Sequence, residues 1–202
     1  MKKLTTILLI AVAGFCSTLN AQTDSKKAPA MSKEEEEMMR AWTAYATPGE
    51  PHKMLAKDNG IWNEEMIMWM TPGTDPIKSS ASCVNTMILG GRYQQSVHTG
   101  SINGEPFEGI STVGYDNAKK KYVSTWVDNM GTGIMVMEGV YDAASKTINL
   151  KGKQVDPASG KEMDVREEFT LVDDNTQIMR MYMTPVGGKE YKTMEIRFTR
   201  QM

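Results

Sequence analysis

The sequence predicts an all-β fold of about ten antiparallel strands in an up-and-down barrel, preceded by one or two helices. Helical periodicity disappears after Gly60, and strand-length segments separated by turn residues follow one another to the end of the chain. Most of these turns are short enough for hairpins, which makes neighbouring strands antiparallel. A series of about ten such strands favours closure into a barrel, because a closed barrel has no exposed edges.

Residues 1–21 predict a secretory signal peptide that is removed before the domain functions. Lys2 and Lys3 form a basic start, residues 4–16 are mainly apolar, and residues 17–21 are small or polar, which places cleavage between Ala21 and Gln22. The apolar run is too short to span a membrane. We therefore expect a periplasmic or secreted protein. Lipid attachment at Cys16 is the alternative, although Phe15 stands where processing requires a small side chain.

The mature chain, residues 22–202, predicts a single domain without an internal disulfide. Loss of Lys2 and Lys3 from 23 basic residues, against 25 acidic ones, leaves a net charge of −4. This balance argues against nucleic acid or an anionic membrane surface as a partner. Cys83 is then the only cysteine, and its alternating surroundings indicate a small buried hydrophobe. These features do not predict the oligomeric state.

Segment 32–58 predicts two helices, and the polar segment before it, 22–31, predicts a disordered linker. Ser32 and Glu35 fit a capping box at the start of a helix over 33–46. The apolar stripe of this helix is Met38, Met39, Trp42 and Tyr45. A second short helix over 51–57 ends at the stop signal 58–60.

The barrel domain, residues 60–202, contains ten segments of strand length. Their predicted ranges are 61–70, 79–89, 92–101, 107–116, 121–128, 133–142, 146–155, 162–171, 176–184 and 189–200. Methionines at every second position give three of these segments an apolar stripe on one face. The stripes are Met66, Met68 and Met70, then Met135 and Met137, then Met179, Met181 and Met183. Such an interior fits a packed core, an apolar cavity or a thioether metal site.

Three charged residues fall on faces that the alternation predicts to point inward: Glu64, Glu167 and Arg200. A buried charge needs a partner or water, so these residues are candidate polar groups inside the barrel. A register slip of one residue would reverse each of these assignments.

Gly60-Ile61-Trp62 follows a short helix at the start of the first strand, and Arg200 lies in the last strand. This arrangement resembles lipocalin-type (calycin) barrels, in which a basic residue of the final strand packs across the tryptophan of a Gly-x-Trp motif. The resemblance implies a calycin-like barrel closed at the end where Trp62 lies.

Several further motifs occur in a fixed order along the barrel segment. They are His52, Gly60-x-Trp62, Trp69-x-x-Pro72-Gly73, Gly90-Gly91-Arg92, Gly104-Glu105-Pro106-Phe107-Glu108-Gly109, Gly114-Tyr115-Asp116, Thr125-Trp126-Val127-Asp128 and Met194-Glu195-Ile196. The order resembles a bacterial family known as domain of unknown function 1579, over roughly residues 51–200. The family implies no particular reaction.

We predict that the barrel binds a small, largely apolar molecule in the cell envelope. The candidate binding residues are Trp62, Glu64, Met66, Met68, Trp126, Glu167, Met181, Met194 and Arg200. We expect Arg200 to close the barrel rather than to contact a ligand.

Three other functions stay open. A small-molecule isomerase or hydrolase would use His52 with Asp128 or Glu64, and it requires these side chains to converge. The alternatives to these catalytic roles are structural: His52 would cap a helix or turn, and Asp128 would cap a turn. The methionine stripes fit Cu(I), and the N-terminal helix fits a protein-interaction module.

No cofactor and no metal site are predicted. With only His52 and His98 in the chain, a site of several histidines is excluded. Nitrobindin-like barrels hold haem through a histidine near the C-terminus, and no histidine follows His98 here, which argues against haem.

Overall fold

The computed structural model describes residues 31–202, so the predicted signal peptide, Cys16 and nearly all of the predicted linker lie outside the described residues. Two helices, α1 (Lys33–Ala46) and α2 (Glu50–Ala56), precede ten strands. The strands are β1 (Gly60–Met68), β2 (Ile77–Ile88), β3 (Tyr93–Ile102), β4 (Glu105–Asp116), β5 (Lys121–Asp128), β6 (Met135–Asp142), β7 (Thr147–Val155), β8 (Glu162–Asp173), β9 (Thr176–Thr184) and β10 (Tyr191–Arg200).

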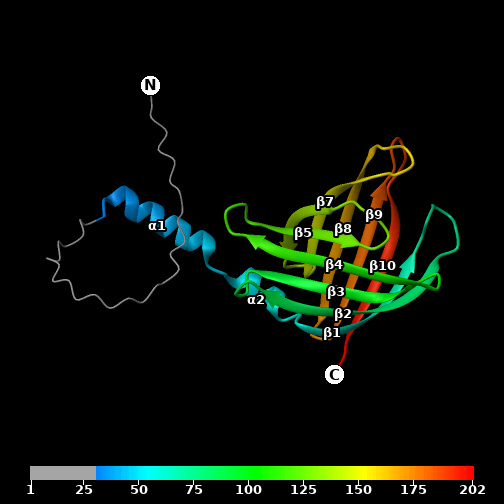
Figure 1. The fold of residues 1–202 in the computed structure, drawn as a ribbon, viewed down its shortest axis with the longest axis horizontal. Helices are drawn as coiled ribbons and strands as arrows, with labels where there is room; N and C mark the ends of the chain where they lie inside the picture. The colour runs from blue at the N-terminus through cyan, green and yellow to red at the C-terminus, as the bar shows by residue number, and fades with distance from the viewer. Residues whose placement is uncertain (1–30) are drawn as a thin grey trace, which may run out of the picture.

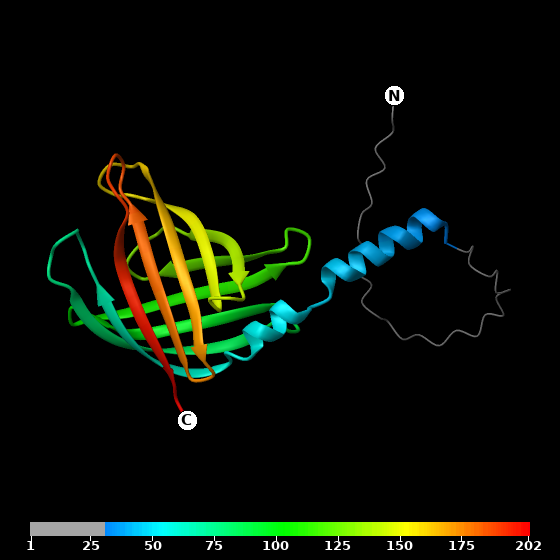
Figure 2. The ribbon, with the colours of Figure 1, turned by 180° about the vertical axis from the view of Figure 1, so that it is seen from behind.

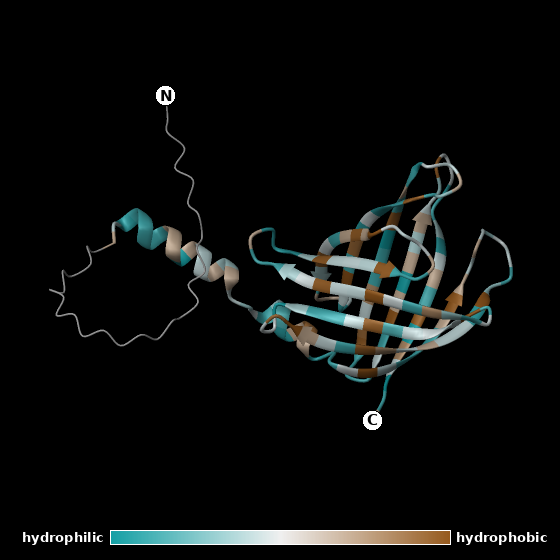
Figure 3. Ribbon diagram, viewed as in Figure 1, coloured by the Kyte–Doolittle hydropathy of each residue, from teal (hydrophilic) through white to brown (hydrophobic). Residues whose placement is uncertain are grey.

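The ten strands form a closed, entirely antiparallel barrel, which confirms the predicted fold class (Figure 1). Each strand pairs with its neighbours in sequence, and β1 also pairs with β10 to complete the ring. Every predicted strand boundary lies within two residues of the observed one. Hydrophobic and hydrophilic residues alternate along the strands, as the colouring in Figure 3 shows.

The register places one face of each strand inside the barrel and confirms the inward direction of Trp62, Glu64 and Met66 in β1. These residues pair with Arg200, Phe198 and Ile196 of β10. The prediction was wrong for Met70, because β1 ends at Met68 and Met70 is 71% exposed. The chain turns just beyond this point, so the methionine stripe of β1 has two members rather than three.

Helix α2 covers one end of the barrel (Figures 1 and 2), and carbonyl groups at and just after its C-terminal end accept hydrogen bonds from inward-facing side chains. Gln94 donates to the Leu55 carbonyl at 2.7 Å. The Trp62 indole and the Asn85 amide both donate to the Asp58 carbonyl, at 2.9 and 3.1 Å. The last carbonyls of a helix lack partners within the helix, so these bonds attach α2 to the barrel.

Arg200 completes this closed end. Its guanidinium lies 4.2 Å from the centre of the Trp62 ring, the contact that the calycin resemblance implied. It also donates to the carbonyls of Lys57, Asn59 and Asp174.

We expect Arg200→Ala to lower the free energy of unfolding by about 2–4 kcal/mol, since it removes a cation–π contact and three charge-assisted hydrogen bonds. Urea unfolding followed by tryptophan fluorescence measures this loss. Arg200→Lys keeps the charge but not the planar group with its several donors, so it should recover only part of the stability. An unchanged midpoint for Arg200→Ala would contradict the closing role.

Helix α1 extends away from the barrel in both views (Figures 1 and 2). The predicted capping box is present, with Ser32 and Glu35 bonding reciprocally, and the helix has no buried residue. The side chains of Arg92 and Asn117 donate to its last carbonyls. Trp42 is 63% exposed, so the apolar stripe of α1 faces solvent. Within residues 31–202 no helix has the length and hydropathy that a membrane crossing needs.

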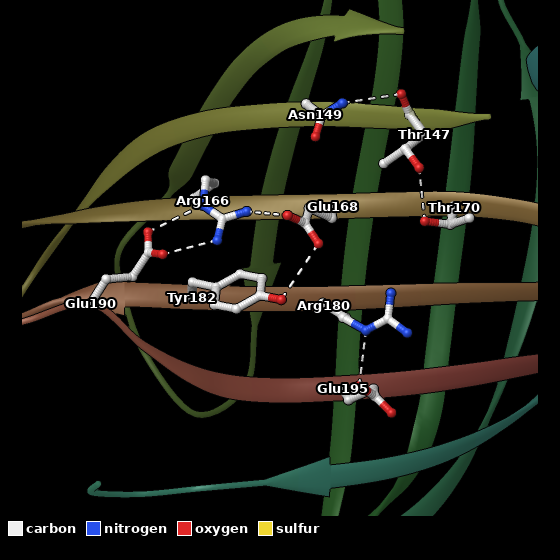
Figure 4. A network of polar contacts seen from close by, with 9 residues as sticks. All are labelled: Thr147, Asn149, Arg166, Glu168, Thr170, Arg180, Tyr182, Glu190 and Glu195. Carbon is white, nitrogen blue, oxygen red and sulfur yellow. Dashed lines mark hydrogen bonds and ion pairs between the residues drawn. The ribbon is translucent and has the colours of Figure 1, made fainter. Parts of the chain in front are cut away.

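The outer surface of β8, β9 and β10 carries a network of ion pairs and hydrogen bonds (Figure 4). Arg166 bonds to Glu168 and Glu190, and Arg180 bonds to Glu195 at 3.0 Å. These side chains alternate along the strands with inward-facing apolar ones, so the charged residues of β8 and β9 lie on the outer face of the barrel. Glu167 is the exception, since it points inward.

Candidate functional site

At the barrel end opposite α2, which we call the accessible end, the inward-facing side chains differ in burial. Met68 and Phe107 are buried near this end, but other side chains that the register directs into the barrel there are only half-buried. They include Met135, Met163, Met183 and Met194. At the α2 end, by contrast, Trp62, Cys83 and Phe198 are buried. Burial is thus complete around Trp62 and incomplete around the four methionines near the opposite end.

The apolar interior is divided into two clusters of buried residues. One contains Leu55, Tyr122, Met137, Ile148, Leu150 and Val165. The other contains Trp62, Met66, Cys83, Met179, Ile196 and Phe198. Phe169 and Met181 pack against both clusters and are themselves only half-buried. Two large apolar side chains in the middle of the barrel are thus in contact with accessible space.

Glu167 lies beside this junction. It pairs with Leu150 on β7 and with Met181 on β9, so its half-buried side chain enters an apolar environment. Among the described residues it has no hydrogen-bond partner, yet no fully buried side-chain oxygen lacks one. The carboxyl oxygens therefore contact accessible space inside the barrel. Loss of solvation raises the pKa of Glu167 to about 7, so that the carboxyl is partly protonated at neutral pH.

A second polar group, which we call the Glu64–His98–Cys83 cluster, lies at the closed end. Cross-strand pairing aligns Trp62 with Cys83 and Cys83 with His98. His98 Nδ1 lies 2.6 Å from Glu64 Oε1, and its Nε2 lies 3.8 Å from Cys83 Sγ. Glu64 is 2% exposed, His98 8% and Cys83 1%. Burial and the nearby Glu64 raise the pKa of the Cys83 thiol to about 12, which leaves it protonated and a poor nucleophile.

Trp126 covers His98 from the side of β5. Its ring meets the imidazole edge-to-face at 5.1 Å, and its Nε1 donates to Asp128 at 2.7 Å. Gly109 on β4 provides the space, because a Cβ there would lie 2.4 Å from the Trp126 ring. Trp126 is therefore a wall of the interior, with its orientation held by Asp128.

The structure does not bring His52 to either of its predicted acidic partners. His52 Nδ1 accepts from the Gly49 N–H at 3.0 Å, and its ring packs on Tyr115 at the α2 end. Asp128 pairs with Gly109 on β4, about 20 Å along the strand from Tyr115 at the usual rise per residue. Asp128 instead accepts the Met130 and Gly131 N–H groups and so caps a turn.

Glu64 does have a histidine partner, but the partner is His98. Sequence reasoning singled out His52 because it belongs to a family motif. The available signal for His98 was its position in an alternating segment, on the same face as Gln94 and Ser96.

A shallow hollow of about 260 Å³ lies at the rim of the accessible end. Its lining includes Trp69, Pro72, Gly73 and Tyr191. Trp69 stacks under the Lys192 ammonium at 4.6 Å, and the Tyr191 hydroxyl donates to the Met70 carbonyl. The Trp69-x-x-Pro72-Gly73 motif thus shapes the rim rather than the interior.

These features define a calycin-like, ten-stranded barrel with a closed end, an accessible end and two inward-facing polar groups. The chain belongs to the family DUF1579, a family of proteins of unknown function, which it matches over residues 47–200.

Comparison with one solved structure supports the fold. The chain is similar to Rv2717c from M. tuberculosis, with 14% identity over 77% of this chain and 100% of that chain, and a TM-score of 0.56. A redesigned β-barrel aligns with 14% identity over 73% of this chain and 95% of that chain, at a TM-score of 0.38. No curated protein matches the chain.

Proposed function

We propose that this protein binds a small, largely apolar molecule inside the barrel and that it acts in the cell envelope. The observation that carries the proposal is the half-buried state of Phe169 and Met181, which lie between two buried clusters. A close-packed core would bury such side chains on all sides. Flexible methionine side chains near the accessible end suit an apolar ligand of variable shape.

Glu167 supplies the polar contact that orients the ligand. A protonated carboxyl beside apolar side chains donates a hydrogen bond to a carbonyl, ether or hydroxyl oxygen. An anionic ligand is disfavoured, because it would meet the carboxylate form in a poorly solvated space. The expected ligand is therefore neutral and mostly hydrocarbon, with an oxygen at one end.

The experiment is the binding of N-phenyl-1-naphthylamine, a neutral fluorescent probe of apolar sites, to residues 22–202. We expect enhanced fluorescence with saturable, one-to-one binding. Met181→Trp fills the space between the clusters and should weaken binding at least tenfold. Ile178→Trp adds the same ring to the outer face of the same strand and is the matched control. Equal binding by wild type and Met181→Trp would place the probe outside the barrel and overturn the proposal.

Native mass spectrometry of the protein from its own envelope fraction addresses the natural ligand and the compartment together. A discrete organic mass that leaves on denaturation supports the proposal and gives the ligand class. A polypeptide that begins at Gln22 supports secretion. The basic start and short apolar run of residues 1–21 are what motivates this part of the proposal.

We predict that stability falls as the pH rises through about 7 and that Glu167→Gln removes most of this fall. The pKa of Glu167 is about 7 in the native state and about 4.5 in the unfolded state, so the native state binds the proton more tightly. The resulting stability is fully present below about pH 4.5 and is lost as the pH rises to about 7. Asp58 acts in the same direction, but its contribution levels off above its native pKa of about 6, so the range between about pH 6 and 7 reports Glu167. Melting temperatures between about pH 6 and 8 test this. A parallel decline in Glu167→Gln would assign the fall to another group.

A further inference from the structure

We propose that Cys83 and His98 bind a divalent transition-metal ion of the zinc type, with Glu64 orienting the imidazole. One ligand atom from each of these three residues, on β1, β2 and β3, lies within 4.8 Å of the other two. All three side chains are buried at the closed end of the barrel. The site is distinct from the proposed ligand space around Glu167.

The donor atoms determine the kind of metal. A thiolate sulfur and an imidazole nitrogen are the ligands that Zn²⁺ and similar borderline ions take in proteins. Mg²⁺ and Ca²⁺ prefer all-oxygen sites and are disfavoured by the sulfur. Asn85 Oδ1, which lies 2.9 Å from Cys83 Sγ, adds an oxygen beside the thiol. The cluster therefore offers sulfur, nitrogen and neutral oxygen to one ion.

The spacing of the two main ligands suits a tetrahedral ion. Zn–S and Zn–N bonds of about 2.3 and 2.0 Å at a tetrahedral angle place the two ligand atoms about 3.5 Å apart. Cys83 Sγ and His98 Nε2 are 3.8 Å apart, so an ion fits between them after a small movement.

The second imidazole nitrogen is already held in the way that metal-binding histidines require. His98 Nδ1 lies 2.6 Å from Glu64 Oε1, which fixes the ring and leaves Nε2 directed at the thiol. A carboxylate on the far nitrogen of a ligating histidine is a common supporting contact at zinc sites. Glu64 is thus a positioning residue. On binding, Cys83 releases its thiol proton to solvent, and the thiolate with the Glu64 carboxylate balances the two positive charges of the ion.

The test is a titration of chelator-treated residues 22–202 with Co²⁺, equilibrated overnight because the site is buried. We expect one equivalent to give a thiolate-to-cobalt absorption band in the near ultraviolet and visible bands of a tetrahedral ion. Zn²⁺ should displace the cobalt and raise the melting temperature. Cys83→Ser should abolish the ultraviolet band, and Glu64→Gln should weaken cobalt binding about 10–100-fold.

His52→Gln is the matched control, because it changes the other histidine of the chain and should leave the cobalt spectrum unchanged. Circular dichroism establishes that each variant is folded. If Cys83→Ser does not fold, a second measurement replaces this variant: bound Zn²⁺ should protect the Cys83 thiol of the wild type from an alkylating reagent. No ultraviolet band in the wild type, or no thiol protection, would overturn the proposal and leave a hydrogen-bonded cluster. Naphthylamine binding by metal-free protein separates this outcome from failure of the proposed ligand function.

Discussion

Replacement of His98 by alanine should destabilise this protein by about 3–5 kcal/mol, a large part of the 5–15 kcal/mol that usually separates folded from unfolded domains. His98 Nδ1 lies 2.6 Å from the Glu64 carboxylate, and both side chains are buried. Without the imidazole, the Glu64 carboxyl has neither its partner nor water. The vacated space also loses the edge-to-face contact with Trp126.

Glu64→Gln is the informative comparison for His98→Ala. It keeps the shape and a hydrogen bond to the imidazole while removing the negative charge, so we expect a loss of about 1–2 kcal/mol. Urea unfolding at pH 7.5 without added metal measures both variants, and the Glu64→Gln, His98→Ala double variant completes the cycle. The two effects should be strongly non-additive, since the double variant has no buried charge left unpaired. Additive losses would show that the two side chains act independently.

The fold was predictable because its signals are local. Turn residues, short spacings and the alternation of Trp62, Glu64 and Met66 define strands, hairpins and an inner face without reference to distant residues. Arg200 was correctly expected to close the barrel, because the Gly-x-Trp motif relates a residue of the first strand to one of the last strand.

The candidate site was less predictable because its partners are distant in the sequence. Glu64 and His98 meet only after β1 pairs with β2 and β2 with β3, and each pairing has its own register. Cys83 was correctly expected to be buried, yet a register is needed to place it beside His98. The wrong partner for Glu64, His52, was chosen because its motif is visible in the sequence. The helix-capping role of His52 was the structural alternative, and the Gly49 N–H bond supports it.

The half-buried state of some inward-facing side chains could not be predicted, since the same methionine pattern fits a filled core. Met179 is buried while Met181, two residues later on the same face, is half-buried. This difference depends on how completely the opposite strands fill the interior, which alternation does not encode. The raised pKa of Glu167 has the same origin, because it follows from the packing around β8.

Gly139→Ala should have an effect at least as large as that of His98→Ala, with a loss above about 4 kcal/mol or a failure to fold. Gly139 lies in β6 and faces Leu150 on β7 and Tyr122 on β5. An added Cβ would lie 1.7 Å from the Asn149 carbonyl oxygen, and this oxygen belongs to the backbone and cannot rotate away. The substitution therefore forces β6 away from β7. Separation of one strand pair opens the ring and exposes two edges, so the loss is not confined to one contact.

Gly133→Ala is the matched control for this substitution, because a Cβ at Gly133 meets nothing within 4 Å. Its free energy of unfolding should stay within about 0.5 kcal/mol of wild type, or rise slightly through the lower entropy of the unfolded chain. Urea unfolding monitored by far-ultraviolet circular dichroism compares the two variants. A folded, stable Gly139→Ala protein would mean that β6 and β7 can separate locally without breaking the barrel. Loss of naphthylamine binding by that folded variant would then locate part of the ligand space against this strand pair.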